Sequence, residues 1–522
     1  MNYSTGGHRG LRTRLLRVMF GGLLLIFLSV AVLAHAKLER SEPKSNSMLQ
    51  QAPQLVELWF SEELESGFNS IEVKDQQGRR FDQGGVNLSE GNKKAQIALS
   101  PLDAGTYTVV WKALSMDQHA LRGDFAFTVT QAAGPGAATA SPPQGAGSPV
   151  DSMPMGKSEE GFKITPSLSA VRWVSYLAMM MLFGGFALYL LVLAPAIHRA
   201  SLAEPAQVAQ VRNASGRRIV KWSWISVVLL LLTSSVSLVF QAAGVFDKSL
   251  AESLSPSLLG QVVSNTGYGG HWFLEILSLT LLIVILFVLS SKLKHAPAAA
   301  HKGLWWAGLF AGAVLLIAPS WTGHAVAAVK DFRLAVVTDW LHLLAGGFWV
   351  GGLFHLAMTL PAALAGVDQT YRIGLLAQVI KRFTRVAMPS VALLVLAGLY
   401  NTWVHVPSFS GFWLTPYGQT LLLKFFLVGL MLFLGGLNNL HFGKRVARLA
   451  KMQGETENDA ERIQLERGFA RSVVLEAAIG VIVLLVTSAL VFMIPARSHP
   501  AMSPDEHPAM SSAGGGKVSH LR

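Results

Sequence analysis

Eight long apolar stretches dominate the second part of this 522-residue chain. Each is close to the roughly 20 residues that a helix needs to cross a bilayer. They cover residues 168–193, 222–246, 271–291, 303–321, 335–360, 385–405, 418–440 and 472–495. Backbone groups in lipid must find their hydrogen bonds inside the protein, and a helix satisfies them within one segment. The sequence therefore predicts an all-α, polytopic membrane domain of eight transmembrane helices over residues 166–496.

Lysine and arginine are distributed unevenly among the loops between these spans. The loops after the first, third, fifth and seventh spans are basic, whereas the loop after the sixth span has no Lys or Arg. Basic loops stay in the cytoplasm. The pattern predicts a multi-pass protein of a bacterial inner membrane, with both the segment before residue 166 and the C-terminal tail in the periplasm. The net charge of +12 comes mainly from these loops, so we do not expect nucleic acid as a partner.

The first 34 residues have the organisation of a secretory signal peptide. Four arginines precede an apolar run at Val18–Val32, and Ala34 offers the small residue that signal peptidase prefers. Cleavage after Ala34 would make His35 the first residue of the mature chain. The alternative is an uncleaved anchor helix, in which case His35 is a solvated residue beside the membrane.

Residues 35–131 have the pattern of a small all-β domain. Short runs rich in β-branched and aromatic residues alternate with glycine-containing turns, which is typical of a β-sandwich or barrel. The predicted strands are Leu55–Phe60, Ile71–Asp75, Ala95–Leu99, Thr106–Ala113 and Asp124–Thr130. The predicted turns lie at Gly78, Gly84–Gly85, Gly91–Asn92 and Asp103–Gly105. Residues 132–165 are rich in Gly, Pro, Ala and Ser and are predicted to be a flexible linker.

Three residues of this β-domain could bind a metal ion. A free α-amine at His35 and its imidazole could chelate one ion, and Asp117 and His119 could add a carboxylate and a second imidazole. In extended backbone Asp117 and His119 share a face because they are two residues apart. Tetragonal Cu(II) prefers such nitrogen and oxygen donors. The chain has no cysteine, so a thiolate site is excluded.

The exported domain resembles the CopC family of periplasmic copper-binding proteins. The matching stretches are His35–Leu38, Ser41–Pro43, Leu58–Glu62, Leu102–Tyr107, Trp111–His119 and Gly123–Phe127. The resemblance implies a Greek-key β-barrel and the Cu(II) ligands His35, Asp117 and His119. Some members also hold Cu(I) in a Met-rich loop. Here the domain has only Met48 and Met116, so we expect no such second site.

Ionisable residues inside the predicted spans are candidates for a copper path, because such groups are costly in the membrane and usually functional. Asp339 and His342 lie three residues apart on one helix face. His324 is near the outer end of the fourth span, and His355 lies about 20 Å below His342 along the helix axis. His271 and Glu275 are further candidates. For each single histidine, the alternative is a hydrogen-bonded polar group between helices.

The membrane half resembles the CopD family of copper-resistance and copper-uptake membrane proteins. The matching residues are Gly323–Ala325, Asp339, His342, Trp349–Leu353, Arg382–Phe383, Thr415–Gly418, Leu422, Lys424 and Glu476. One position departs from the family pattern. The family commonly has an arginine after a Thr-x-Gly motif in the third span, whereas this chain has Thr266–Gly270 followed by Glu275.

The C-terminal tail, residues 497–522, repeats a His-Pro-Ala-Met tetrapeptide. Its candidate copper ligands are His499, Met502, His507 and Met510. The alternative is a polar tail with chance histidines.

These observations together predict a copper-homeostasis protein that is not an enzyme. The exported domain would capture Cu(II), and the membrane domain would pass Cu(I) or Cu(II) inward, with other periplasmic copper proteins as further partners. No catalytic triad and no ATP-binding loop is evident in the sequence. Two alternatives remain. The first is a haem-binding electron-transfer protein that reduces copper, since histidines on neighbouring spans also hold b-type haem. The second is a copper sensor or buffer.

Overall fold

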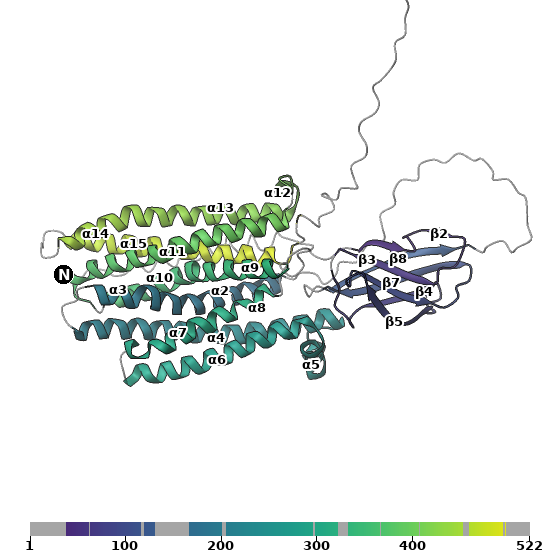
Figure 1. The fold of residues 1–522 in the computed structure, drawn as a ribbon, viewed down its shortest axis with the longest axis horizontal. Coiled ribbons are helices and arrows are strands. Elements are labelled where there is room, and N and C mark those ends of the chain that lie inside the picture. Colours follow the sequence, from purple (N-terminus) through teal and green to yellow (C-terminus); the bar gives the residue numbers. More distant parts are fainter. Residues whose placement is uncertain are drawn as a thin grey trace, which may run out of the picture.

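The computed structural model contains a β-domain beside one end of a long helical bundle (Figure 1). The structure describes residues 38–61, 63–115, 120–130, 166–200, 205–295, 298–321, 332–365, 367–406, 408–452, 459–493 and 496. We call the end of the bundle nearest the β-domain the proximal end, and the opposite end the distal end.

The β-domain is a sandwich of two four-stranded sheets, which confirms the predicted small all-β class. The first sheet has the order β1 (Leu38–Glu42), β3 (Leu55–Phe60), β6 (Lys94–Leu99) and β5 (Asp82–Ser89). The second sheet has the order β2 (Met48–Leu49), β8 (Ala120–Val129), β7 (Gly105–Leu114) and β4 (Ser70–Asp75). Neighbouring strands are antiparallel, except that β2 runs parallel to β8.

Strand β3 shows how the sequence produces this core. Val56, Leu58 and Phe60 are buried and alternate with more exposed residues, because successive side chains point to opposite faces of a strand. The Phe60 ring packs edge-on against Trp111 of the other sheet, with 5.3 Å between ring centroids. Apolar faces of the two sheets therefore meet in the interior.

One predicted turn is wrong. Gly84–Gly85 lies inside β5, where the pairing with β6 shifts register between Gln83 and Asn87. Gly84 has a φ of +75°, which residues other than glycine rarely adopt. This strand has no fully buried residue and is interrupted by its glycines, so it lacks the alternating apolar pattern that identifies the five predicted strands.

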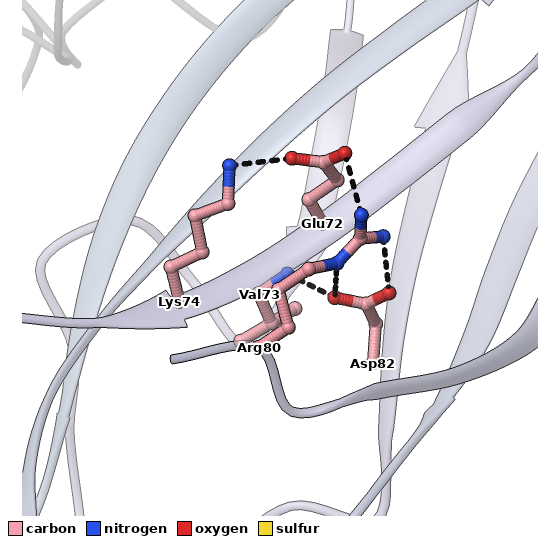
Figure 2. A network of polar contacts seen from close by, with 5 residues as sticks. All are labelled: Glu72, Val73, Lys74, Arg80 and Asp82. Atoms are coloured by element: carbon pink, nitrogen blue, oxygen red, sulfur yellow. Dashed lines mark hydrogen bonds and ion pairs between the residues drawn. The ribbon is translucent and has the colours of Figure 1, made fainter. Parts of the chain in front are cut away.

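An ion-pair network joins β4 to the start of β5 (Figure 2). Arg80 pairs with Asp82 at 2.7 Å and with Glu72 at 3.0 Å, and Lys74 pairs with Glu72 at 2.6 Å. The Val73 backbone N–H also donates to Asp82 at 3.0 Å. Burial, the largest single influence, acts to raise the pKa of Asp82, but the hydrogen bonds from Arg80 and Val73 lower it below its ordinary value.

In the helical half, eight of the described helices are long and apolar enough to cross a membrane, as the sequence predicts. The first four spans contain α2 (Pro166–Leu188), η1 (Tyr189–Leu193), α3 (Ala194–Arg199), α4 (Pro205–Phe246), α6 (Gly267–His295), α7 (Lys302–Leu315) and α8 (Ile317–Ser320). The last four contain α9 (Phe332–Gly346), η4 (Gly347–Gly351), α10 (Gly352–Ala365), α11 (Gln369–His405), α13 (Pro416–Leu437), η5 (Asn438–Gly443), α14 (Lys444–Lys451) and α15 (Asp459–Leu490).

Short helices connect several of these spans. They are η2 (Glu252–Leu254), α5 (Pro256–Asn265), η3 (Ala298–His301) and α12 (Gly411–Leu414). Most spans are longer than the predicted apolar stretches. The helices continue past the apolar residues into polar and basic flanks, as α4 does from Pro205.

A close glycine contact holds α2 against η4. A Cβ at Gly351 would lie 1.9 Å from the Met180 carbonyl oxygen, and a Cβ at Gly184 would lie 2.5 Å from the Gly351 carbonyl carbon. Only glycine allows two backbones to approach so closely, as is common in membrane helix packing. This contact fixes η4 in the centre of the bundle, and η4 carries Trp349.

Candidate functional site

The three predicted Cu(II) ligands His35, Asp117 and His119 lie outside the described residues. The chain segments that lead to them are described. Leu38 pairs with Phe60 at the end of β3, and Leu64, four residues later, bridges to Ser115 at the end of β7. The described residues on either side of the predicted ligands therefore converge at one end of the sandwich.

This same end of the sandwich contacts the helical bundle. Leu114 and Val245 are buried together, with Phe68 and Phe246 packed against them. The two phenylalanine rings meet edge-on, with 6.2 Å between centroids. The β-domain thus rests on the proximal end of α4 through an apolar contact.

Polar contacts surround this apolar centre. Arg122 of β8 forms an ion pair with Asp247 at 2.7 Å, and Lys112 of β7 donates a hydrogen bond to the Val245 carbonyl. Burial lowers the pKa of Lys112, and the neighbouring Arg122 cation acts in the same direction. Glu65 Oε1 accepts a 2.9 Å hydrogen bond from the backbone N–H of Gly267, at the start of α6.

Two of the predicted membrane candidates lie just below this contact. His271 and Glu275 are on the first turns of α6, and both are buried. The His271 ring meets the Tyr268 ring edge-on at 4.3 Å between centroids. These two ionisable side chains are therefore four and eight residues beyond the Gly267 backbone that the β-domain contacts.

A second group of ionisable side chains lines a cavity of about 330 Å³ between α9, α11, α13 and α15. We call it the proximal cavity, because its lining residues lie in the proximal halves of these helices. Asp339 and His342 come from α9, His405 from α11, and Lys424 from α13. Asp339 and His342, which are predicted to share a helix face, both line this one cavity.

Hydrogen bonds orient the side chains of the proximal cavity. His342 Nδ1 lies 3.2 Å from the Leu394 carbonyl oxygen, so its Nε2 remains available to a ligand. Asn401 Nδ2 donates to Asp339 Oδ1 at 3.4 Å. His405 Nδ1 lies 2.7 Å from the Asn401 carbonyl oxygen, in the next turn of the same helix. Each imidazole thus has one nitrogen occupied by the backbone.

The proximal cavity offers donors but no assembled metal centre. Among the described residues, no group of three or more His, Asp or Glu side chains is close enough to hold a metal ion. Imidazole and carboxylate groups suit a copper ion that binds transiently. The Lys424 ammonium lines the same cavity and offsets the charge of Asp339.

The other predicted candidates are placed differently. His355 is fully buried in α10, and its Nε2 lies 2.8 Å from the Met181 carbonyl oxygen of α2. It is not among the residues that line the proximal cavity. His324 and the tail residues lie outside the described part of the chain. The tail residues are His499, Met502, His507 and Met510.

His405 and Asn401 are lining residues that the sequence analysis did not single out. They are four residues apart near the end of the sixth span, and therefore share a helix face. That spacing was an available signal. What the sequence could not supply is the packing of α11 on α9, which brings this face to Asp339.

Three family profiles match the chain in order. The CopC domain matches residues 38–130, the N-terminal domain of copper resistance protein D-like proteins matches residues 163–331, and copper resistance protein D matches residues 377–490.

Individual relatives match the same parts of the chain. "Copper transport protein CutJ" of Bacillus subtilis is 26% identical and aligns over 92% of this chain and 78% of its own length. "Copper resistance protein C" of Pseudomonas syringae pv. tomato is 33% identical over 23% of this chain and 96% of its own length. "Copper resistance protein D" of the same organism is 28% identical over 61% of this chain and 94% of its own length.

Proposed function

This chain belongs to the CopC and CopD copper-resistance families, and on that premise we propose that its β-domain captures Cu(II) in the periplasm and its helices carry copper across the inner membrane into the cytoplasm. Copper is the ligand of both halves in this proposal. The oxidation state in the bundle is Cu(I) or Cu(II), since imidazole and carboxylate donors accept both.

Capture uses the amine and imidazole of His35 with the side chains of Asp117 and His119. The convergence of Leu38 and Ser115 at one end of the sandwich supports this ligand set. Nitrogen and oxygen donors in this number favour tetragonal Cu(II).

The observation that carries the proposal is the contact between the two halves. The end of the sandwich that leads to the proposed ligands rests on α4 and α6, held by Phe68, Lys112 and Arg122. A β-domain docked in this way can release copper directly above the bundle. His271, on the first turns of α6, is the nearest candidate acceptor.

From there the path leads into the proximal cavity, where Asp339, His342 and His405 offer the next donors. The basic loops support an orientation with the β-domain outside and the distal end in the cytoplasm. In that orientation the proximal cavity opens toward the periplasmic half of the membrane, and transport is import.

The decisive experiment measures copper accumulation in cells that express the intact chain or the His342→Ala variant. The intact chain should raise cellular copper, and His342→Ala should abolish the increase, because the cavity loses the imidazole that shares a helix face with Asp339. His198→Ala is a matched control, since His198 is exposed in α3 at the distal end. Cu(II) binding by the β-domain should be unchanged in both variants.

Two results would contradict the proposal. A fall in cellular copper with the intact chain would mean export. Wild-type accumulation by correctly inserted His342→Ala protein would place the path elsewhere in the bundle, and His271, Glu275 and His355 would then be substituted next.

A further inference from the structure

A second cavity, of about 310 Å³, lies between the same set of spans in the distal half of the bundle. We call it the distal cavity. On α11 its last lining residue is Val391, and the proximal cavity begins at Leu394. On α13 the proximal cavity ends at Val428 and the distal cavity begins at Leu432. About one helical turn of apolar side chains therefore separates the two cavities.

Glu476 of α15 lines the distal cavity and is only 3% exposed. Its Oε1 accepts a 3.3 Å hydrogen bond from Trp349 Nε1, and its Oε2 accepts a 3.0 Å hydrogen bond from Asn438 Nδ2. Both donors are neutral. Within the described residues, no ion pair involves this carboxyl group.

Both donors belong to π-helical turns. Trp349 lies in η4 and Asn438 is the first residue of η5. Single π-helical turns inside membrane helices are frequent at functional sites, because they redirect side chains that a regular helix would place elsewhere. Here two separate turns direct their donors at one carboxyl group.

The distal cavity also contains an unused acceptor. Asn438 is 7% exposed, and its Oδ1 has no hydrogen-bond partner among the described residues. A buried acceptor without a partner costs about 1–3 kcal/mol. Glu476 and Asn438 therefore present oxygen atoms to a ligand that brings positive charge or an acidic hydrogen.

A proton fits this arrangement better than a metal ion. A hard cation such as Mg²⁺ or Ca²⁺ takes six or more oxygen ligands, and Trp349 and Asn438 already occupy both carboxyl oxygens with N–H groups. Copper(I) prefers sulfur and imidazole donors to carboxyl and amide oxygens. A single proton needs one free lone pair on Glu476, and Asn438 Oδ1 or a water molecule can accept it in turn.

Glu476 is the only titratable residue among those that line the distal cavity. The elements packed against Glu476 contain other charged residues and histidines. They are Arg172 on α2, His355 on α10, Arg372, Lys381, Arg382, Arg385 and His405 on α11, Lys424 on α13, His441 on η5, and Asp459, Glu461, Arg462, Glu466, Arg467 and Arg471 on α15. None of them lines the distal cavity. A charge on Glu476 thus has no partner at hand, and an unpaired charge at membrane depth is unfavourable by several kcal/mol.

We infer that Glu476 is a proton-exchange site that couples copper movement to proton movement. The carboxylic acid releases its proton when copper occupies the distal cavity and takes up one proton when copper leaves. No bond other than the O–H bond is broken or formed, and no electron is transferred. This inference rests on the copper transfer proposed above.

The test uses the full chain reconstituted in vesicles that contain a pH-sensitive dye. Copper added outside should change the internal pH with the intact chain, and Glu476→Gln should abolish this change. The single amide oxygen of glutamine can still accept a hydrogen bond from Trp349 Nε1, and its NH2 group can donate to Asn438 Oδ1 once the Asn438 amide turns over. Glu466→Gln is the matched control, because Glu466 is on the same helix but does not line the cavity.

A second measurement does not depend on transport. Infrared spectra of the purified chain, recorded without copper over a range of pH, should contain a protonated carboxyl band that Glu476→Gln lacks and Glu466→Gln retains. Identical spectra of the intact chain and Glu476→Gln would overturn the proton site. Copper uptake by the intact chain without any pH change, or with a requirement for sodium instead, would overturn the coupling.

The two proposals fail in different ways. If the intact chain moves no copper but shows the infrared band of Glu476, the proposed transport is wrong and the proton site stands. If copper moves at the same rate in Glu476→Gln and in the intact chain, with the same pH change, the transport stands and the coupling is wrong.

Discussion

Charged side chains are placed differently in the β-domain and in the helical bundle. In the sandwich, several charged side chains form ion pairs, as Arg80 does with Asp82 and Lys94 with Glu57. In the bundle, Asp339 and Glu476 line cavities, and the described residues form no ion pair with either. Paired surface charges keep a small domain soluble and add little to its stability. A carboxyl group inside a membrane domain lowers stability, so Asp339 and Glu476 are the residues on which the proposed handling of cations depends.

The largest expected effect concerns Cu(II) binding by the β-domain. One extra residue before His35 in the mature chain removes the α-amine from the proposed chelate. Cu(II) affinity should fall by orders of magnitude, whereas the bundle should still fold and insert. Affinity should also fall in acid, because an α-amine with an ordinary pKa near 8 must lose its proton to bind. Competition titrations with a Cu(II) chelator measure both effects.

An extra residue at the C-terminus is the control for that variant. Unchanged Cu(II) affinity after the N-terminal addition would eliminate the proposed ligand set.

A smaller effect is expected where the two halves meet. Asp247→Lys removes the ion pair with Arg122 and puts a cation beside both Arg122 and Lys112. Undocking should become more favourable by about 1–2 kcal/mol, or roughly 5–30-fold. Copper uptake at limiting copper should slow accordingly, while Cu(II) binding by the β-domain should not change. Cross-linking between β7 and α4 would report docking directly.

Asp103→Lys is the matched control, since Asp103 is exposed before the start of β7, at the far end of that strand from Leu114. If Asp247→Lys and Asp103→Lys take up copper at equal rates, the observed contact does not serve transfer.

The smallest effect concerns the surface network of the sandwich. Asp82→Asn should destabilise the β4–β5 region by about 1 kcal/mol at neutral pH, because the charged hydrogen bonds with Arg80 become neutral. The pKa of Asp82 is lowered in the folded protein, so this stabilisation is present above the ordinary aspartate pKa. It is lost as the pH falls through the folded value. Hydrogen exchange of the β4 amides in the intact chain should therefore distinguish the two proteins at pH 7 but not in strong acid.

A difference in β4 exchange that persists in strong acid would show that Asp82→Asn acts through packing and not through charge.

The sequence predicted the elements of both halves better than their assembly. The alternation in β3 and the apolar stretches of the eight spans are local patterns, and both were confirmed. Strands β1, β2 and β5 were not predicted, because β1 and β5 have no fully buried residue and β2 has only two residues.

For the candidate site, the sequence identified Asp339 and His342 as ionisable residues inside spans, and Glu476 as a residue that matches the CopD family pattern. It could not identify their partners, because Asn401 and Asn438 approach them through helix packing and a π-helical turn. The docking of β7 on α4 depends on surfaces that each half exposes separately, and no pattern within one segment encodes it.

The thin apolar layer between the two cavities also determines where the membrane voltage acts. Where water fills both cavities, each cavity is at nearly the electrical potential of the solution that it faces. The membrane voltage then falls mainly across the single helical turn between Val391 and Leu394. A monovalent cation that crosses this turn, about 5 Å long, then experiences almost the whole difference, worth about 2.3 kcal/mol per 100 mV. With a negative interior, this short step would draw copper inward before any coupled ion contributes.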